Sequence, residues 1–530
     1  MNKDKSQQTG NFILILVAMG LGVLAGIMFA DTGSRYRHAG NSTLHDKMDE
    51  VMELVESDYV DLVDTDSLSE RLLAVMLAEL DPHSTYLSAR ETERTNEMMR
   101  GTFEGVGLLL HREGDTTYVG QVIDGGPSEG IGIQAGDMIV NVDGERVSGV
   151  DMPADSVVAR LRGPRRSKVT VEVNRNGKPL TFTIQRGIID HKTLPYAAML
   201  DDTTGYIMLT SFSSTSHDEF RDALQRLKGR GMRHLIFDLR GNGGGSLASA
   251  IGIAGELLPK GSLIVYTQGA HSRRNDVKAR SGGLFTSGRV TVMIDESSAS
   301  ASEVVSGALQ DNDRATIVGR RSFGKGLVQT DFELSDGSSV LLTTARYYTP
   351  SGRCIQRPYS NCTDEYYSSY MQQLVDEAYA DSATAAINDS TPYYTVGGRT
   401  VYGGGGITPD IILTYRKDPT FVYYNKLASA GIINAVAFDQ VKKNAARLTA
   451  QYPNADAFCR GFVTTNGMID EIVRRGEQKG IARDDHSLQK QRRLMATMVK
   501  AYIGQALYND EVFYRIYRDE DEDLKRILKK

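Results

Sequence analysis

The stretch HLIFDLRGNGGGSLASAIGIAGELL, residues 234–258, decides the fold of the central part of this chain. It begins with a short apolar run at His234–Leu239, passes through four glycines within Arg240–Gly245, and continues as an apolar helical pattern at Ser246–Leu258. A strand, a glycine-rich loop and a helix in immediate succession are typical of an α/β fold. The flanking sequence repeats this alternation, with strands predicted at Tyr206–Leu209, Ser262–Tyr266 and Val290–Ile294 and helices at Asp218–Lys228 and from Ser300 onward. Folds of this kind place functional residues in the loops that leave the ends of their strands.

Two segments of this region carry a serine and a lysine without a histidine near them. The motif SASASE spans residues 298–303, and Lys325, in the motif FGKG, follows Ser300 by 25 residues. None of the nine histidines falls between His271 and His486. A serine hydroxyl needs a base to become nucleophilic at neutral pH, so the lysine is the candidate base. Its pKa would have to fall from about 10.4 to roughly 7–8, a change worth roughly 4 kcal/mol that burial in an apolar pocket can supply.

A purely structural interpretation of the serine is also available. Ser300 and Glu303 fit the Ser-x-x-Glu capping box that begins many helices. The two interpretations are compatible, because the first turn of a helix offers backbone amides and a positive dipole end to an oxyanion.

The chain resembles the carboxy-terminal processing peptidases, also called tail-specific proteases, from about residue 81 to residue 412. The resemblance rests on separate motifs in the family's order: LDPHS (80–84), a PDZ-like segment (103–144), DLRGNGGG (238–245), SASE (300–303), FGKG (323–326) and GGITPD (405–410). Each motif alone is weak, but the combination is specific. The resemblance implies a serine endopeptidase that cleaves exported proteins and recognises their free, apolar C-terminal tails.

The family pattern also implies roles for individual residues. It places the nucleophile at Ser300, the base at Lys325 and a lysine-orienting glutamine at Gln329. A supporting acidic residue falls at Asp311, too far along the helix to act as a direct base, so we expect a structural or electrostatic role for it. No cofactor is expected.

The glycine loop lacks the Gly-Lys-Ser/Thr ending of a phosphate-binding P-loop and the spacing of a dinucleotide site. In the family it lines the active site, where its amides can approach the scissile carbonyl. The candidate oxyanion hole is the amide of Ala301 together with that of Gly243 or Gly244, and the sequence does not choose between the two glycines.

The sequence before the α/β region has a different pattern of apolar residues, typical of short strands. Short β-like runs lie between Gly, Pro and Asp turns at Gly107–Leu110, Thr117–Val122, Met138–Val142, Lys168–Arg175 and Leu180–Arg186, with a short helix predicted at Pro127–Gly136. This order is similar to a bacterial PDZ domain, which binds an extended peptide by strand addition and its terminal carboxylate by backbone amides. The family pattern places that amide loop at Gly105, Val106, Gly107 and Leu108. The alternative is that these glycines only permit a tight start to the strand.

The N-terminus carries an uncharged run of 19 residues, Phe12–Ala30, just long enough to span a bilayer. Lys3 and Lys5 precede it and favour a cytoplasmic N-terminus. We expect an uncleaved anchor in the inner membrane with the catalytic part in the periplasm; the alternative is a cleaved signal peptide and a soluble periplasmic protein.

Composition excludes other classes of protein. The formal charge of −6 gives no electrostatic reason to expect nucleic-acid binding. Of three cysteines, Cys354 and Cys362 are close enough to form a short disulfide, which would leave Cys459 unpaired. Neither the cysteine spacing nor the histidines suggest a metal site.

These patterns predict a multidomain α/β protein. The expected parts are a membrane segment (1–31), an N-terminal helical subdomain (32–100), a PDZ-like β domain (101–187), an α/β peptidase core with crossover helices (188–415) containing a surface insertion (355–396), and a C-terminal helical domain (416–530). The last domain is expected to brace the protease or to form a homodimer, and the acidic run Asp519–Asp523 to be a solvated face. An adaptor protein is a further expected partner.

Two alternative functions fit parts of the sequence. Ser322 and Lys325 match the Ser-x-x-Lys motif of penicillin-binding proteins and class A β-lactamases, but glycines flank the lysine and no matching partner motifs follow. The other alternative is a non-catalytic periplasmic scaffold, a PDZ module on a dead peptidase core. The presence of Ser300, Lys325 and Gln329 argues against it.

Overall fold

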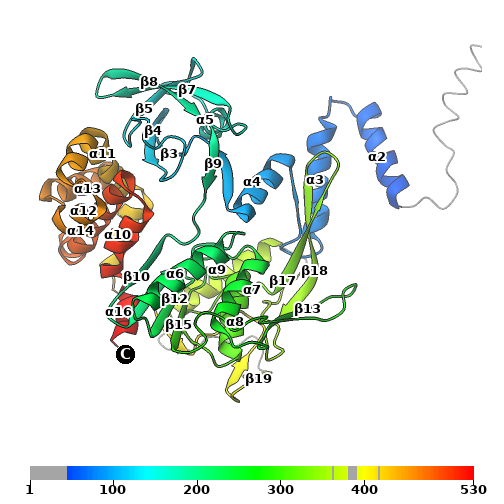
Figure 1. Cartoon of the computed structure of the whole chain (residues 1–530). Helices are drawn as coiled ribbons and strands as arrows, with labels where there is room; N and C mark the ends of the chain where they lie inside the picture. Colours follow the sequence, from blue (N-terminus) through cyan, green and yellow to red (C-terminus); the bar gives the residue numbers. More distant parts are fainter. Residues whose placement is uncertain (1–43, 361–362, 380–390, 416–417, 530) are drawn as a thin grey trace, which may run out of the picture. The chain divides into compact units, whose positions relative to one another are not determined.

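The computed structural model describes residues 44–360, 363–379, 391–415 and 418–529 (Figure 1). The chain divides into two compact units after Met76. The described part of the first unit comprises α2 (Leu44–Asp58) and most of α3 (Thr65–Ala78). The predicted anchor at Phe12–Ala30 lies outside the described residues. Within the described ranges, no helix combines the length and the apolar character needed to cross a bilayer.

The second unit is built around a six-stranded sheet in the order β10-β11-β12-β15-β16-β21. Its strands are β10 (Tyr196–Met199), β11 (Thr204–Met208), β12 (His234–Asp238), β15 (Arg289–Ile294), β16 (Thr316–Gly319) and β21 (Ile411–Ile412). All neighbours are parallel except β10 and β11. The strands predicted at residues 206–209, 234–239 and 290–294 are therefore confirmed.

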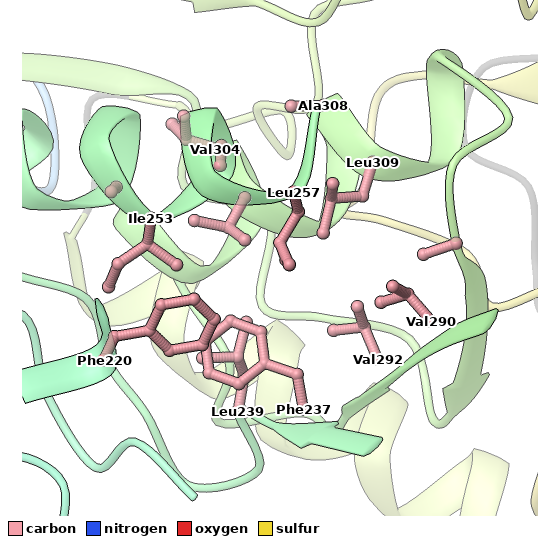
Figure 2. Close-up of a cluster of buried hydrophobic side chains, with 14 of the residues drawn as sticks. Phe220, Phe237, Leu239, Ile253, Leu257, Val290, Val292, Val304, Ala308 and Leu309 are labelled. Carbon is pink, nitrogen blue, oxygen red and sulfur yellow. The ribbon is translucent and has the colours of Figure 1, made fainter. Parts of the chain in front are cut away.

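Helices α6 (Ser216–Gly229), α7 (Leu247–Leu257) and α8 (Ala301–Asp311) connect these strands and cover one face of the sheet. Figure 2 shows side chains from α7 and α8 pointing toward those of β12 and β15. Successive residues of a strand face opposite sides, so Phe237 joins this core while Ile236 joins the core on the other face. That second face is covered by α16 (Glu522–Leu528), whose Leu524 and Ile527 are buried.

A second, five-stranded sheet carries the segment after Lys325. It contains β1 (Thr85–Leu87), β18 (Ser339–Tyr348), β13 (Leu263–Gln268) and β14 (Asn275–Lys278), with β17 (Leu327–Glu333) paired to β18. The strand predicted at Ser262–Tyr266 exists as β13, but it belongs to this antiparallel sheet and not to the central one.

The PDZ-like region forms a sheet in the order β3-β4-β5-β7-β8, with β6 (Glu145–Arg146) paired to β5 and helix α5 (Ala154–Leu161) beside it. The strands are β3 (Leu108–Glu113), β4 (Thr116–Val122), β5 (Met138–Val142), β7 (Lys168–Arg175) and β8 (Lys178–Gln185), so all five predicted runs are confirmed. The helix predicted at Pro127–Gly136 is wrong: this segment consists of turns and bends. Gly130 and Gly132 adopt φ values of 77° and 96°, which interrupt any helix there.

In the described part of the C-terminal region, α15 (Asp510–Tyr517) and the five helices before it pack around one core, which Ala135 of the PDZ-like region also joins. These five helices are α10 (Phe421–Ser429), α11 (Ile432–Gln451), α12 (Ala455–Gly461), α13 (Asn466–Gln478) and α14 (Asp485–Leu507), and α15 is followed by a short 3₁₀ turn at Arg518–Glu520. The acidic run Asp519–Asp523 is not simply a solvated face, because Asp521 is only 7% exposed and pairs with Arg240. The remaining elements are α4 (Ala89–Arg100), β2 (Thr102–Gly105), β9 (Gly187–Asp190), α9 (Thr363–Tyr379), β19 (Pro392–Tyr394) and β20 (Thr400–Tyr402).

Candidate active site

Ser300 occupies the last position of the loop between β15 and α8, immediately before the first helical residue, Ala301. Its φ of 53° lies in the left-handed region, which a residue with a side chain adopts at a cost of about 1–3 kcal/mol. Such strain persists only where the surroundings enforce it, and it gathers at functional sites. The geometry therefore marks Ser300 as more than an ordinary helix cap.

Glu303, one turn into α8, joins the serine segment to the lysine segment. Its Oε2 accepts the Ser300 amide at 2.8 Å and the Lys325 amide at 2.9 Å. The sum of these two bond lengths, 5.7 Å, is the greatest separation that the two backbone nitrogens can have. The other oxygen, Oε1, accepts the Gly324 amide at 2.8 Å and the Ser322 hydroxyl at 2.6 Å. One fully buried carboxylate thus brings together the two residues that the sequence set 25 positions apart.

The electrostatics of Lys325 favour an uncharged amine. Burial lowers the pKa of Lys325 below its ordinary value, although the negative charges of Glu303 and Asp81 act in the opposite direction. In the part of the chain that the structure describes, no hydrogen bond or ion pair engages the Lys325 amine. Burial also raises the pKa of Glu303, to about 7, so this carboxylate is only partly ionised at neutral pH.

The glycine loop after β12 lies against Ser300. A Cβ placed on Gly244 would come within 2.8 Å of the Ser300 Cβ, so only glycine allows the two loops to approach this closely. The Gly244 amide is already used, because it donates to Asn242 Oδ1 at 2.9 Å. Among the described residues, the amides of Gly243 and Ala301 have no acceptor, and the space beside Gly243 is open. The two glycines, which the sequence does not distinguish, therefore differ in whether their backbone amide is already hydrogen-bonded.

Among the described residues, no hydrogen bond joins the side chain of Gln329, on β17, to Lys325. Its side-chain amide donates to Thr343 Oγ1 at 3.2 Å, and that hydroxyl donates to Asp81 Oδ1 at 3.1 Å. Asp81 also accepts the Ser84 hydroxyl at 2.6 Å. Burial alone would raise the pKa of Asp81, but these hydrogen bonds hold it below its usual range. Hydrogen bonds therefore connect Gln329, through Thr343, to the Asp81 carboxylate, whose negative charge acts on Lys325.

A histidine does come close to Lys325, from far away in the sequence. His83 packs its ring edge-on against Phe323, with ring centroids 6.4 Å apart, and against Tyr366 at 5.4 Å. Burial, followed by the positive charge of Lys325, lowers the pKa of His83 to about 4, which makes it a weak base. Tyr366 belongs to α9, in the insertion predicted to lie on the surface, yet it is only 3% exposed. Part of that insertion therefore covers the lysine loop.

Asp311 lies at the opposite end of α8 from Ser300. Its carboxylate accepts the Arg353 guanidinium at 2.7 Å and the Ser351 hydroxyl at 2.6 Å, and both members of the ion pair are fully buried. It therefore fixes the turn after β18, and it makes no contact with the serine or the lysine.

Ser322, the serine of the alternative Ser-x-x-Lys motif, is fully engaged in the fold. Its hydroxyl donates to Glu303 at 2.6 Å and accepts the Ile407 amide at 2.6 Å, and the residue lies in a loop and not on a helix. A nucleophile held in this way could not approach a substrate, which removes the structural basis for that alternative.

The four residues of the predicted tail-binding loop, Gly105, Val106, Gly107 and Leu108, link β2 to β3. The Val106 carbonyl accepts the Ser128 hydroxyl at 2.5 Å, and Gly107 has a φ of 75°. Strand β3 pairs only with β4, so its other edge has no strand partner in the described sheet. An extended peptide could add to that edge next to the loop.

Sequence reasoning missed four residues near the site: Asp81, His83, Thr343 and Tyr366. The motif LDPHS was a signal for the first two, but nothing in the sequence connected it with Lys325. Cys362 lies outside the described residues, as does any disulfide that it would form. Within the described ranges no group of three or more potential metal-ligating side chains occurs.

Comparisons with known proteins bear on this geometry. A profile described as peptidase family S41 matches residues 203–360, a PDZ-domain profile matches residues 118–175, and a family of unknown function, DUF8443, matches residues 423–509. The carboxy-terminal-processing protease of Bartonella bacilliformis is 37% identical over 316 residues, which cover 58% of this chain and 71% of that protein. The carboxy-terminal processing protease CtpA of Bacillus subtilis is 32% identical over 351 residues, covering 65% and 74% respectively. Among solved structures, a photosystem II D1 C-terminal processing protease is 26% identical and covers 69% of this chain and 87% of its own, with a TM-score of 0.34.

Proposed function

The chain belongs to peptidase family S41, as a carboxy-terminal processing serine protease with a PDZ domain, and on that premise we propose that Ser300 and Lys325 form its catalytic dyad. The observation that carries this proposal is the shared Glu303 Oε2, which accepts the amides of both residues. The lowered pKa of the half-buried Lys325 is the second support, because a base must be neutral before it can accept a proton.

The chemistry is acyl transfer from a peptide to the serine. Neutral Lys325 takes the Ser300 proton as the hydroxyl oxygen attacks the scissile carbonyl carbon, and the amides of Gly243 and Ala301 stabilise the oxyanion. Lys325 then gives the proton to the leaving amine, and the peptide C–N bond breaks. Water, deprotonated by the same amine, hydrolyses the acyl-enzyme and restores the serine.

The choice of Gly243 over Gly244 follows from their hydrogen bonds. A donor that already serves Asn242 would have to break that bond before it could serve a substrate, whereas the Gly243 amide is free among the described residues. Gln329 and Asp81 act at one remove, by fixing the charge beside the lysine. Asp311 has a structural role at the far end of α8.

The PDZ domain supplies the preference for chain ends. A substrate tail adds to the free edge of β3, and its carboxylate is bound by the amides of the loop from Gly105 to Leu108. A terminal carboxylate distinguishes a tail from an internal segment, so the same loop would reject amidated ends.

Exported proteins are the proposed substrates, because the uncharged run Phe12–Ala30 predicts an inner-membrane anchor with the protease in the periplasm. Carbonate extraction of cell membranes, with mass analysis of the mature N-terminus, distinguishes this anchor from a cleaved signal peptide. An adaptor protein and a homodimer stay predictions from the sequence alone.

The dyad is tested with unfolded proteins that carry different C-terminal tails. Ser300→Ala and Lys325→Ala should each abolish turnover, while Lys325→Ala keeps the affinity of the PDZ domain for a tail peptide. Ser297→Ala and Lys278→Ala, at exposed positions, are the matched controls and should cleave normally. Substantial activity in Lys325→Ala would show that another group is the base.

A further inference from the structure

The C-terminal end of the chain returns to the peptidase core. After α15 the chain makes a turn at residues 518–523 and continues as α16, which packs on the sheet through Leu524 and Ile527. This turn lies beyond residue 509, where the match to the family of unknown function ends, and beyond residue 360, where the peptidase match ends. Its acidic side chains face the loops that leave the sheet.

Asp521 holds the arginine that begins the glycine loop. Arg240 Nη2 donates to Asp521 Oδ2 at 2.5 Å, and Arg240 Nη1 donates to Asp521 Oδ1 at 3.2 Å. The other edge of the guanidinium pairs with Asp238, whose Oδ2 also accepts the Tyr206 hydroxyl at 2.6 Å. Burial would raise the pKa of Asp521, but Arg240 holds it below its usual range, so the pair is ionised at neutral pH. Arg240 is thus clamped between a strand end and the C-terminal turn.

Asp523 reaches the other two loops through a second arginine. Arg320 Nη1 donates to Asp523 Oδ2 at 3.1 Å, and Arg320 Nε donates to Glu296 at 2.8 Å. Glu296 lies in the loop that ends at Ser300, and Arg320 begins the segment that leads to Lys325. The turn is therefore bonded directly to the roots of two loops of the site, at Arg240 and Arg320, and Arg320 connects it to the third loop through Glu296.

We propose that Asp521 is a positioning residue of the peptidase site, acting through Arg240 on the glycine loop that carries the Gly243 amide. The inference rests on the proposed function, because it assumes that this loop binds the oxyanion. The acidic turn at residues 518–523 then has a role in turnover, because it positions an oxyanion donor in addition to leading into the helix that covers the sheet.

The pair of Asp521 and Arg240 holds the glycine loop at its first residue. Arg240 is 18% exposed and Asp521 only 7%, so their bidentate pair is little screened by water. Without the Asp521 charge, the guanidinium keeps Asp238 but loses its second anchor, and the backbone that follows gains freedom. An oxyanion donor contributes about 10²–10³ in kcat, and misplacement by a fraction of an ångström forfeits part of that factor. Substrate binding at the PDZ domain does not depend on this loop.

The substitution that isolates this effect is Asp521→Asn in the full-length protein. Asparagine keeps the volume, and its oxygen can still accept the Leu524 amide that Asp521 caps at the start of α16. Asp519→Asn is the matched control, since it removes the same charge from the same turn at a side chain that is 71% exposed. Both proteins are compared with the parent in steady-state cleavage of one tail peptide and in inhibition by a peptide boronate, which forms a tetrahedral adduct.

We expect kcat of Asp521→Asn to be about tenfold below that of Asp519→Asn, with KM within twofold and boronate affinity reduced in step with kcat. Equal kcat in the two variants, or a change confined to KM, would overturn the inference. If near-UV circular dichroism shows that Asp521→Asn is unfolded, the test is made with Asp523→Asn instead. A kcat about threefold below the parental value would support the positioning role of the turn, and a parental kcat would overturn it. Activity that persists in Ser300→Ala would instead reject the proposed dyad, so the two failures are distinguishable.

Discussion

Gly244→Ala measures how closely the glycine loop is packed against the candidate nucleophile. A Cβ on Gly244 would lie 2.8 Å from both the Ala299 carbonyl oxygen and the Ser300 Cβ, on backbone with a φ of 105°. Ordinary contact begins near 3.4 Å, so the loops must separate by about 0.6 Å, the difference between these distances. The backbone strain costs about 1–3 kcal/mol and the overpacking about 1–3 kcal/mol more. We expect the free energy of unfolding to fall by about 2–6 kcal/mol.

The same separation should reduce turnover. A misplacement of 1 Å in a catalytic site can cost about 10²-fold, so a shift of about half that size should lower kcat roughly tenfold. The assay is steady-state cleavage of a tail peptide, with enzyme concentrations corrected for the folded fraction. Unfolding is followed by denaturant titration in a Ser300→Ala background, where self-cleavage cannot distort the transition.

Two other glycines provide controls. Gly243→Ala meets no atom within 4 Å and lies outside the left-handed region, so its free energy of unfolding should stay within about 0.5 kcal/mol of the parent. Gly255→Ala, inside α7 with open space around it, should keep parental kcat and gain about 0.5–1 kcal/mol of stability. Parental stability and kcat in Gly244→Ala would refute the packing of the loop against Ser300.

Substitutions at three other positions test the buried ion pair, the pH dependence of stability and tail-peptide binding. Asp311→Ala leaves the buried Arg353 guanidinium without its carboxylate, so denaturant titration should show a loss of about 3–5 kcal/mol; a loss below about 1 kcal/mol would contradict a buried ion pair. Burial raises the folded-state pKa of Glu303 from 4.5 to about 7, so the stability it contributes is complete below pH 4.5 and is lost as the pH rises through 7. Between pH 4.5 and 7 the free energy of unfolding of the parent should therefore fall by about 3 kcal/mol more than that of a Glu303→Gln variant. If the two free energies of unfolding changed with pH in parallel, the raised pKa of Glu303 would be rejected. Gly107→Ala puts a side chain at φ 75° and its Cβ 3.0 Å from Pro127, so calorimetry should show tail-peptide affinity falling by about 1–2 kcal/mol, roughly tenfold; unchanged affinity would exclude this loop from the binding site.

The parts of the fold that the sequence could predict are those encoded within short windows. The apolar runs at residues 234–239 and 290–294 become β12 and β15, and the helix expected from Ser300 begins at Ala301. These elements depend on neighbours along the chain, which is why they can be predicted without tertiary information. The loops of the site are a different case, because each of their motifs is weak alone and the resemblance to a known family assigned Ser300 and Lys325 to them.

Contacts between distant segments carry no such local signal. Asp81 accepts the Thr343 hydroxyl across 262 positions, and Asp521 pairs with Arg240 across 281. A run of acidic residues is usually solvated, so composition favoured the wrong environment for Asp521. The helix predicted at residues 127–136 failed for a different reason: Gly130 and Gly132 adopt left-handed φ values, which interrupt a helix.

The arrangement around Lys325 shows how the pKa of a lysine can fall beside two carboxylates. An ammonium group that paired with Glu303 or Asp81 would be stabilised, and its pKa would rise. Instead, the described structure satisfies Glu303 with three backbone amides and the Ser322 hydroxyl, and Asp81 with amides and hydroxyls. In the described structure neither carboxylate forms a hydrogen bond or ion pair with the Lys325 amine, although their negative charges still act to raise its pKa. Burial outweighs this effect of the two charges, which is why the pKa of Lys325 falls although both of its charged neighbours are anions.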